Sequence, residues 1–233
     1  MSEVSGTMIA DRLGVIREQL AAFPNATLIA VSKNQSLEKI REAYRLGQRD
    51  FGENYVQELV SKSEQLASEG LSEIRWHFIG KLQTNKVKHL LPVVSSIHTV
   101  DSRKLAEEIS KRWTSQGHDK KTAVFAEVNI DHESGKHGFS PAEVVRQVES
   151  MKDLPGLDWR GLMCIPSRSG GLSGASFRRL VELEQQCRPV TAGELSMGMS
   201  EDYTVALREG FGASRLWVRL GTGVFGPRED RPN

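Results

Sequence analysis

The sequence contains few of the residues that indicate a secreted, metal-binding or membrane protein. It has 2 cysteines and 6 histidines among 233 residues. The cysteines, Cys164 and Cys187, are expected to be reduced thiols rather than a disulfide framework. The histidines show neither an H-x-x-x-H motif nor a Cys/His spacing, so no metal site is predicted. No apolar run approaches the ~20 residues of a membrane span, so no membrane partner is expected.

The chain also lacks an excess of either charge. Its formal net charge is +1, with 26% charged and 38% hydrophobic residues. That balance is ordinary for a globular protein and does not favour nucleic-acid binding by bulk electrostatics. The start of the chain shows no basic segment followed by an apolar one, as a secretory leader would. These features together predict a cytoplasmic protein.

What the sequence does contain is a repeated pattern of strand followed by helix. Apolar or β-branched runs such as residues 123–130 suit parallel strands covered on both faces. Eight strands alternating with helices predict a single (β/α)₈ barrel domain over residues 1–233, with a doubly wound open sheet as the structural alternative. The strands are expected near residues 27–32, 48–52, 74–80, 96–100, 122–130, 158–165, 193–197 and 214–220.

The chain has too few residues after the eighth strand for a full eighth crossover helix. An amphipathic segment precedes the first strand, and its apolar positions are Met8, Ile9, Leu13, Ile16 and Leu20. This extra N-terminal helix is expected to fill the missing place in the helical ring.

Lys33 is the most informative single residue. It follows the apolar run 28–32, so it lies at the C-terminal end of the first strand, where barrels place reactive groups. A lysine there can form a Schiff base with a carbonyl, although a solvated lysine at a strand–loop junction is the plainer interpretation. The last strand opens into Gly221-Thr222-Gly223, a turn suited to phosphate. A phosphorylated aldehyde could react with Lys33 and place its phosphate at the 221–223 turn. Pyridoxal 5′-phosphate (PLP) is such a compound.

Other strand ends supply further candidates. Asn54 follows the second strand and is able to donate to a ring oxygen, or it caps the next helix. His77 lies in the apolar third strand, where it either stacks on an aromatic cofactor or is a hydrogen-bonded core residue. Met163, in the sixth strand, walls a cofactor pocket or packs in the core.

The loops after strands seven and eight often form the phosphate site of such barrels. Ser196 and Gly198 present a hydroxyl and a backbone N–H there, and Ser200 is expected to cap a helix ending at Gly210. Arg219 lies two residues before Gly221, so it points to the same side of the sheet. An arginine facing a pyridine nitrogen disfavours the pyridinium, whereas an arginine paired with a buried carboxylate is the alternative.

Taken in order, these motifs resemble the PLP homeostasis protein family, whose fold is similar to the N-terminal barrel of alanine racemase (PLP fold type III). The motifs that carry the resemblance are Ala30-Val31-Ser32-Lys33, the run 51–58 (FGENYVQE), the run 76–86 (WHFIGKLQTNK), the run 161–166 (GLMCIP), the run 195–200 (LSMGMS) and the run 219–223 (RLGTG).

The resemblance implies that Lys33 is the Schiff-base lysine and that Arg219 faces the pyridine nitrogen. It implies phosphate contacts from Ser196, Gly198, Gly221 and Thr222, and pocket positions for Asn54, His77 and Met163. It also implies storage, buffering or delivery of PLP, possible PLP-accepting apoenzymes as partners, and no catalytic residues.

Two segments depart from the family pattern. The proline that usually follows the lysine motif is missing from Lys33-Asn34-Gln35-Ser36. The loop 133–139 keeps a Lys-x-Gly-Phe appearance but has His137 within it.

The alternative function is a PLP-dependent racemase. Alanine racemases add a C-terminal β domain with a tyrosine base, whereas this chain ends soon after its eighth strand and has no tyrosine beyond it. A binding protein without turnover, acting as a monomer, is therefore favoured. A class I aldolase-like barrel using lysine without PLP, and a barrel with no ligand, are the remaining alternatives.

Overall fold

The computed structural model describes residues 3–227, and the side chains from residue 8 onward. The ends of the predicted 1–233 domain, residues 1–2 and 228–233, lie outside this range. Eight parallel strands form a closed barrel in sequence order, as predicted. The strands are β1 (Ala26–Val31), β2 (Asp50–Glu53), β3 (Arg75–Phe78), β4 (Ser96–Val100), β5 (Thr122–Val128), β6 (Leu157–Cys164), β7 (Glu194–Ser196) and β8 (Arg215–Leu220).

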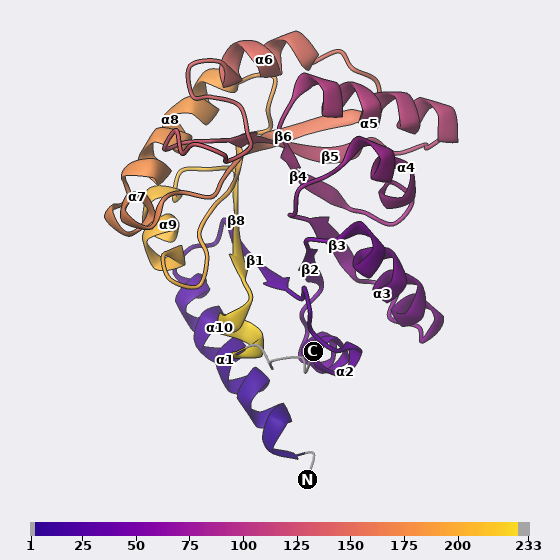
Figure 1. The fold of residues 1–233 in the computed structure, drawn as a ribbon. Helices are drawn as coiled ribbons and strands as arrows, with labels where there is room; N and C mark the ends of the chain where they lie inside the picture. Colours follow the sequence, from indigo (N-terminus) through magenta and orange to yellow (C-terminus); the bar gives the residue numbers. More distant parts are fainter. Residues whose placement is uncertain (1–2, 228–233) are drawn as a thin grey trace.

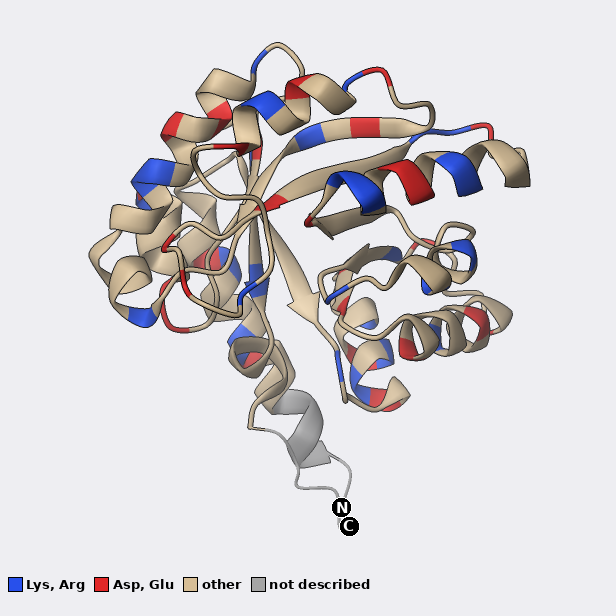
Figure 2. Ribbon diagram, turned by 45° about the horizontal axis from the view of Figure 1, so that its top comes forward, with Lys and Arg blue, Asp and Glu red and all other residues tan. Residues whose placement is uncertain are grey.

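The helices surround the barrel (Figure 1). They are α1 (Glu3–Ala21), α2 (Leu37–Arg45), α3 (Val56–Ser68), η1 (Thr84–Lys86), α4 (Val87–Leu90), α5 (Arg103–Gln116), α6 (Val144–Met151), α7 (Arg168–Ser173), α8 (Ala175–Cys187), α9 (Tyr203–Glu209) and α10 (Thr222–Phe225). Basic and acidic residues are interspersed along these helices, whereas the strands carry few of them (Figure 2). Among the described residues, no helix combines the length and apolarity needed to cross a bilayer.

The barrel closes because β1 pairs in parallel with β8, with Ala26 opposite Leu216 and Ala30 opposite Leu220. Most buried apolar side chains fill the layer between the strands and the helices. A second, smaller cluster comprises Ile29, Phe125, Met163 and Trp217.

Helix α1 occupies the place of the missing eighth crossover helix, as the sequence predicted. Its residues Ile9, Leu13 and Ile16 are buried in the main core. The helix packs against α2 and against the short α10 that follows β8, and α1 and α10 lie side by side in Figure 1. On its other side, α1 contacts α9, because the Tyr203 hydroxyl of α9 donates a hydrogen bond to Gln19 of α1. The helical ring is thus completed by a segment that precedes the barrel.

Two helix starts differ from the sequence expectation. The run Ser140-Pro141-Ala142-Glu143 has the serine, proline and glutamate of a capping box, which predicts a helix start at Pro141, but α6 begins at Val144. The Ser140 hydroxyl instead donates to Glu143 Oε2 at 2.6 Å, which holds residues 140–143 as a turn. Ser200 was expected to cap the helix after β7, but α9 begins at Tyr203 after Asp202. Asp202 Oδ1 accepts from the Met199 N–H at 2.7 Å, so the carboxylate closes a turn before the helix.

Candidate functional site

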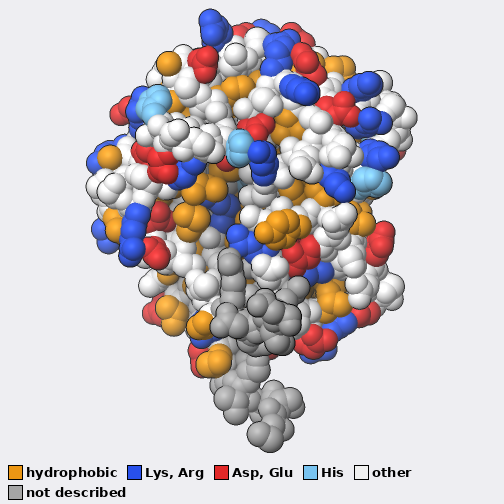
Figure 3. All heavy atoms as spheres, viewed as in Figure 1, with side chains coloured by type: hydrophobic (Ala, Val, Ile, Leu, Met, Phe, Trp, Pro, Cys, Tyr) orange, Lys and Arg blue, Asp and Glu red, His pale blue; other side chains and the backbone are white. Residues whose placement is uncertain are grey.

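A cavity of about 510 Å³ opens at the C-terminal ends of the strands. Basic side chains lie in a depression near the middle of this face, beside hydrophobic ones (Figure 3). The cavity is lined by Val31, Lys33, Asn54, Ile79, Ile165, Pro166, Arg168, Leu172, Met199, Ser200, Glu201, Asp202, Arg219, Gly221 and Thr222. This is the edge of the barrel where strand ends from distant parts of the sequence converge.

The chain on both sides of Lys33 is held by polar contacts, and those before it are buried. Before it, the Ser32 hydroxyl donates to Glu53 Oε1 at 2.6 Å, and the Ser32 carbonyl accepts from Lys62 Nζ at 2.7 Å. After it, the Asn34 N–H donates to Glu58 Oε1 at 2.7 Å. The structure therefore fixes the point from which the Lys33 side chain extends into the cavity.

Lys62 is the centre of this network. Its ammonium lies 2.8 Å from Glu53 Oε1 and 2.8 Å from Glu58 Oε1. The Lys62 side chain is 8% exposed and that of Glu53 is 0% exposed, so the pair is shielded from water. Burial raises the pKa of Glu53, although Lys62 opposes that shift. Helix α3 thereby contributes a charged anchor for the loop that carries Lys33.

The loops after β7 and β8 meet at Ser200. The Thr222 hydroxyl lies 3.2 Å from Ser200 Oγ, and the Gly223 N–H donates to the same oxygen at 3.3 Å. A Cβ added to Gly221 would come no closer than 3.5 Å to other atoms, so the glycine is not required by packing alone. Two hydroxyls and a glycine-rich turn at one end of the cavity form a suitable environment for a phosphate.

Arg219 enters the cavity from β8 and is 5% exposed. Its guanidinium donates to Ser196 Oγ at 2.8 Å and to the Cys164 carbonyl at 2.9 Å. Burial lowers the pKa of Arg219, but a guanidinium keeps its proton in proteins. The hydrogen bonds fix a permanent donor at the floor of the cavity.

A polar chain continues from this arginine into the barrel. Ser196 Oγ lies 2.7 Å from His98 Nδ1, and His98 Nε2 lies 3.1 Å from His77 Nδ1. His77 Nε2 then contacts Asp50 Oδ1 at 2.9 Å. Burial, with smaller contributions from His77 and Arg219, lowers the pKa of His98 well below its usual value. A neutral His98 can accept the Ser196 hydroxyl proton at Nδ1, which leaves the serine oxygen to accept from Arg219.

The structure brings five of the nine predicted cofactor-binding residues to this cavity: Lys33, Asn54, Arg219, Gly221 and Thr222. The other four are not among its lining residues. His77 belongs to the polar chain inside the barrel. Met163 is fully buried as a member of the second, smaller apolar cluster. Ser196 contacts Arg219, and the Gly198 carbonyl accepts from the Arg219 N–H at 2.9 Å. These four residues lie below or beside the cavity and support its walls.

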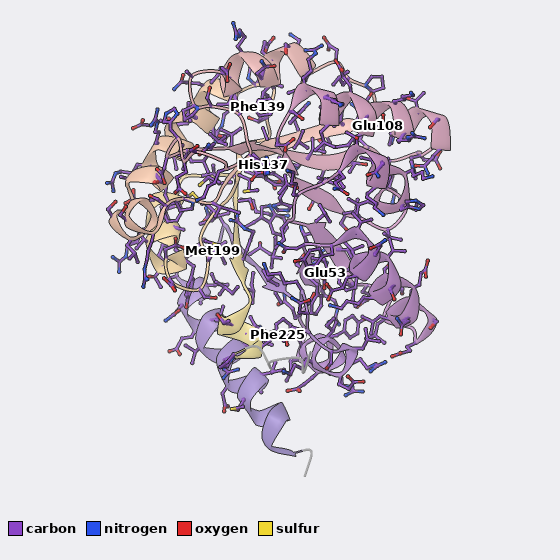
Figure 4. The ribbon with its side chains drawn as sticks, viewed as in Figure 1. Glu53, Glu108, His137, Phe139, Met199 and Phe225 are labelled. Carbon is purple, nitrogen blue, oxygen red and sulfur yellow. The ribbon has the colours of Figure 1, made fainter. Side chains whose placement is uncertain are left out.

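Sequence reasoning missed several lining residues. Ile79 and Ile165 lie at the ends of the predicted strands 74–80 and 158–165. Pro166 and Met199 come within two residues after predicted strands, so position alone was a usable signal for all four. Arg168 and Leu172 belong to α7, a helix within the long β6–β7 connection, and no motif marked them. Figure 4 shows Met199 on the β7–α9 side of the barrel and Glu53 on the β2–α3 side. Within residues 3–227 no cluster of three or more histidine, cysteine, aspartate or glutamate side chains could hold a metal ion.

Comparison with known proteins identifies the class first. Residues 5–229 match the family model described as the N-terminal domain of alanine racemase. Solved alanine racemase from Clostridium difficile has the same fold, with a TM-score of 0.71 at 15% identity over 96% of this chain and 58% of that one. The chain is therefore a barrel of the alanine racemase N-terminal type.

Nearer relatives define the family. The chain is 41% identical to the pyridoxal phosphate homeostasis protein of Mus musculus, covering 87% of this chain and 77% of the relative. It is 38% identical to that of Pseudomonas aeruginosa, covering 87% and 84%. PipY of Synechococcus elongatus, solved with PLP bound, has a TM-score of 0.81 at 38% identity, covering 94% of this chain and 100% of that one. The chain belongs to the pyridoxal phosphate homeostasis protein family.

Proposed function

We propose that this protein binds PLP as a Schiff base on Lys33 and takes part in PLP homeostasis by storage, buffering or delivery, without catalytic turnover. The observation that carries the proposal is the convergence of Lys33, Arg219 and the Ser200–Thr222 loops on one cavity. The PLP-bound structure of PipY, a relative of 38% identity, supports the same assignment.

The residues present fit the cofactor. PLP supplies an aldehyde that a lysine amine can bind covalently, and Lys33 offers that amine. At the other end, Ser200, Gly221 and Thr222 offer hydroxyl and backbone groups for the phosphate. Asn54 lines the cavity, and its buried Oδ1 has no hydrogen-bond partner in the described structure. A buried polar atom that lines a cavity and has no protein partner is available to a ligand.

Arg219 favours a protein that binds the cofactor over an enzyme that uses it to transform a substrate. Its two hydrogen bonds, to Ser196 and to the Cys164 carbonyl, hold the guanidinium in place. If PLP bound with its pyridine nitrogen toward Arg219, this fixed cation would disfavour protonation of that nitrogen. The ring would then withdraw electrons weakly, so carbanion chemistry would gain little assistance from it.

A racemase is the second candidate, because the fold is shared with alanine racemase. Racemisation needs proton acceptors on both faces of the substrate. The three tyrosines of the chain, Tyr44, Tyr55 and Tyr203, all lie in the described part, and none lines the cavity with Lys33. The geometry therefore favours the binding protein.

Borohydride reduction of the PLP-loaded protein, followed by peptide mass mapping, tests the proposal. We expect the label on Lys33 and its loss in Lys33→Ala. Lys111→Ala, on the outer face of α5, is the matched control and should remain labelled at Lys33. A label confined to another lysine, or steady alanine racemisation by the purified wild type that Lys33→Ala abolishes, would contradict the proposal.

We extend the proposal to the setting of the protein. Cys164 and Cys187 are both free and buried, and burial raises the pKa of each thiol to about 12. Two inert free thiols suit the reducing cytoplasm. We propose that the protein acts there as a monomer and hands PLP to apoenzymes. Sedimentation of the purified protein, and the rate of activation of a PLP-free aminotransferase by the loaded protein compared with free PLP, test these points.

A further inference from the structure

A second cavity adjoins the first on the same face of the barrel. It has a volume of about 280 Å³ and lies over the ends of β2 to β6. Asn54, Ile79 and Ile165 line both cavities. This volume is near the lower limit of about 300 Å³ for small-molecule sites, so only a small ligand would fit.

The rim of this second cavity is basic. Lys81 follows β3, while Lys136 and His137 come from the loop between β5 and α6. Lys81 Nζ lies 2.7 Å from His137 Nε2, so the two elements meet above the cavity. Lys136 Nζ is 2.7 Å from Glu133 Oε2, on the same loop. Figure 4 shows His137 near the middle of the view, close to where the strands converge.

The wall of the cavity carries a carboxyl, Glu127, at the end of β5. Burial and the nearby Asp101 raise its pKa to about 7, while Arg219 and Lys81 oppose the shift. Near neutral pH this carboxyl can therefore exist in either protonation state, and it can accept a hydrogen bond from an ammonium group. The cavity thus combines a basic rim with an acidic wall.

We propose that this cavity binds a small α-amino acid, with its carboxylate at Lys81 and Lys136 and its ammonium group toward Glu127. A zwitterion matches both signs of charge, whereas a phosphate dianion would bring its charge toward Glu127. An apolar ligand would offer no polar group either to the basic rim or to the Glu127 carboxyl. The inference rests on the proposed function only in that the neighbouring cavity is taken to hold PLP.

The shared wall predicts coupling between the two ligands. Asn54, Ile79 and Ile165 contact both cavities, so filling one changes the surroundings of the other. Coupling of binding is reciprocal, so an amino acid that alters PLP affinity has its own affinity altered by the same factor. The site would link cofactor binding to the supply of amino acids.

Calorimetric titration of L-alanine into protein carrying borohydride-reduced PLP tests the inference. Reduction fixes the cofactor on the lysine, so the added amine cannot exchange with it. We expect saturable binding of L-alanine and weaker binding of propanoate, alaninamide and inorganic phosphate. Lys81→Met should weaken alanine binding about tenfold, the loss expected for one charge-assisted hydrogen bond. Lys136→Met, in the loop between β5 and α6, should likewise weaken alanine binding.

Lys86→Met is the matched control, because Lys86 lies near Lys81 in the chain but does not line this cavity. It should leave alanine binding unchanged. Glu127→Gln should reduce the preference for alanine over propanoate. Labelled wild type that binds no alanine, equal affinity in Lys81→Met, Lys136→Met and wild type, or tighter binding of phosphate than of alanine would overturn the inference. Failure to label Lys33 in the wild type would instead overturn the proposed function.

Discussion

Glu127 is a carboxyl whose surroundings favour its neutral form. Its usual pKa of 4.5 is raised to about 7, mainly by burial, with Asp101 adding to the shift and Arg219 and Lys81 opposing it. The folded protein therefore binds more protons than the unfolded chain between these two values. Since stability falls with pH wherever the folded state binds more protons, ionisation of Glu127 destabilises the fold as pH rises through this window.

Replacement of Glu127 by glutamine should remove that loss. We expect Glu127→Gln to match the wild type near pH 4.5 and to be more stable above pH ~7, by up to about 3 kcal/mol. Urea unfolding of the PLP-free protein at several pH values measures the difference. Glu107→Gln, at an exposed position on α5, should show no such pH-dependent gain. An equal difference between Glu127→Gln and wild type at all pH values would contradict the burial argument.

The reactive residues were predictable one at a time, whereas their supports were not. Lys33 and Arg219 lie at strand ends, and strand alternation places Arg219 on the same side as Gly221. Ser200 was expected to cap a helix, but its hydroxyl instead joins the loops after β7 and β8. That contact spans residues 200 and 222–223, and no local pattern indicates which distant turn a serine will meet.

Helix α3 connects the cofactor loop to the second strand through Lys62. The ammonium contacts Glu53, Glu58 and the Ser32 carbonyl, all within 2.8 Å. Removal of one partner from a buried ion pair leaves the other charge without compensation. Loss of Lys62 should therefore destabilise the fold mainly through Glu53, which is fully buried at the end of β2 and would keep an uncompensated charge.

Lys62→Met tests this anchor. We expect a loss of about 3 kcal/mol in the free energy of unfolding, the lower part of the range for breaking a buried pair. PLP retention should also weaken, because Ser32 loses a contact next to Lys33. Glu53→Gln combined with Lys62→Met should recover part of the stability, since no buried charge then remains unpaired. Urea unfolding and the yield of borohydride label on Lys33 provide the two measurements.

Lys111→Met, on the exposed face of α5, is the control and should leave both quantities unchanged. If Lys62→Met retained full stability and full label, the anchor would contribute neither to folding nor to the position of Lys33.

The strands were predicted within a few residues, and the shorter helices less well. A mostly apolar run such as β5 is explained by burial on both faces, which is a strong sequence signal. The short helices α7, in the β6–β7 connection, and α10, after β8, are too short for a hydrophobic periodicity to be recognised. Before the delayed start of α6, residues 140–143 form a turn in which the Ser140 carbonyl accepts from the N–H groups of both Glu143 and Val144.

The barrel as a whole depends on α1 to complete its outer layer. Leu13 is 1% exposed within the main core, whereas Val15 on the same helix is 55% exposed. Substitution at the buried position tests how much the packing of α1 contributes to stability, and substitution at the exposed position tests how much the helix contributes without packing.

Leu13→Ala should destabilise the protein by about 2–5 kcal/mol, the usual range for a leucine removed from a core. Val15→Ala should change stability by less than about 0.5 kcal/mol, as exposed substitutions usually do. Chemical unfolding of both variants makes the comparison. If the two variants were equally stable, α1 would not be a structural part of the barrel.

The sequence by itself predicted the eight strands, favoured a barrel over an open sheet, and indicated the PLP family and the five residues that reach the cavity. Each of these follows from local periodicity or from motifs at strand ends. Only the tertiary structure decided that His77, Met163, Ser196 and Gly198 lie outside the cavity lining, and that a second, charged cavity adjoins the first. The physical reason is that the depth of a side chain in a barrel, and the distant loop it meets, depend on strand register and closure. Neither quantity is encoded in any short segment of the chain.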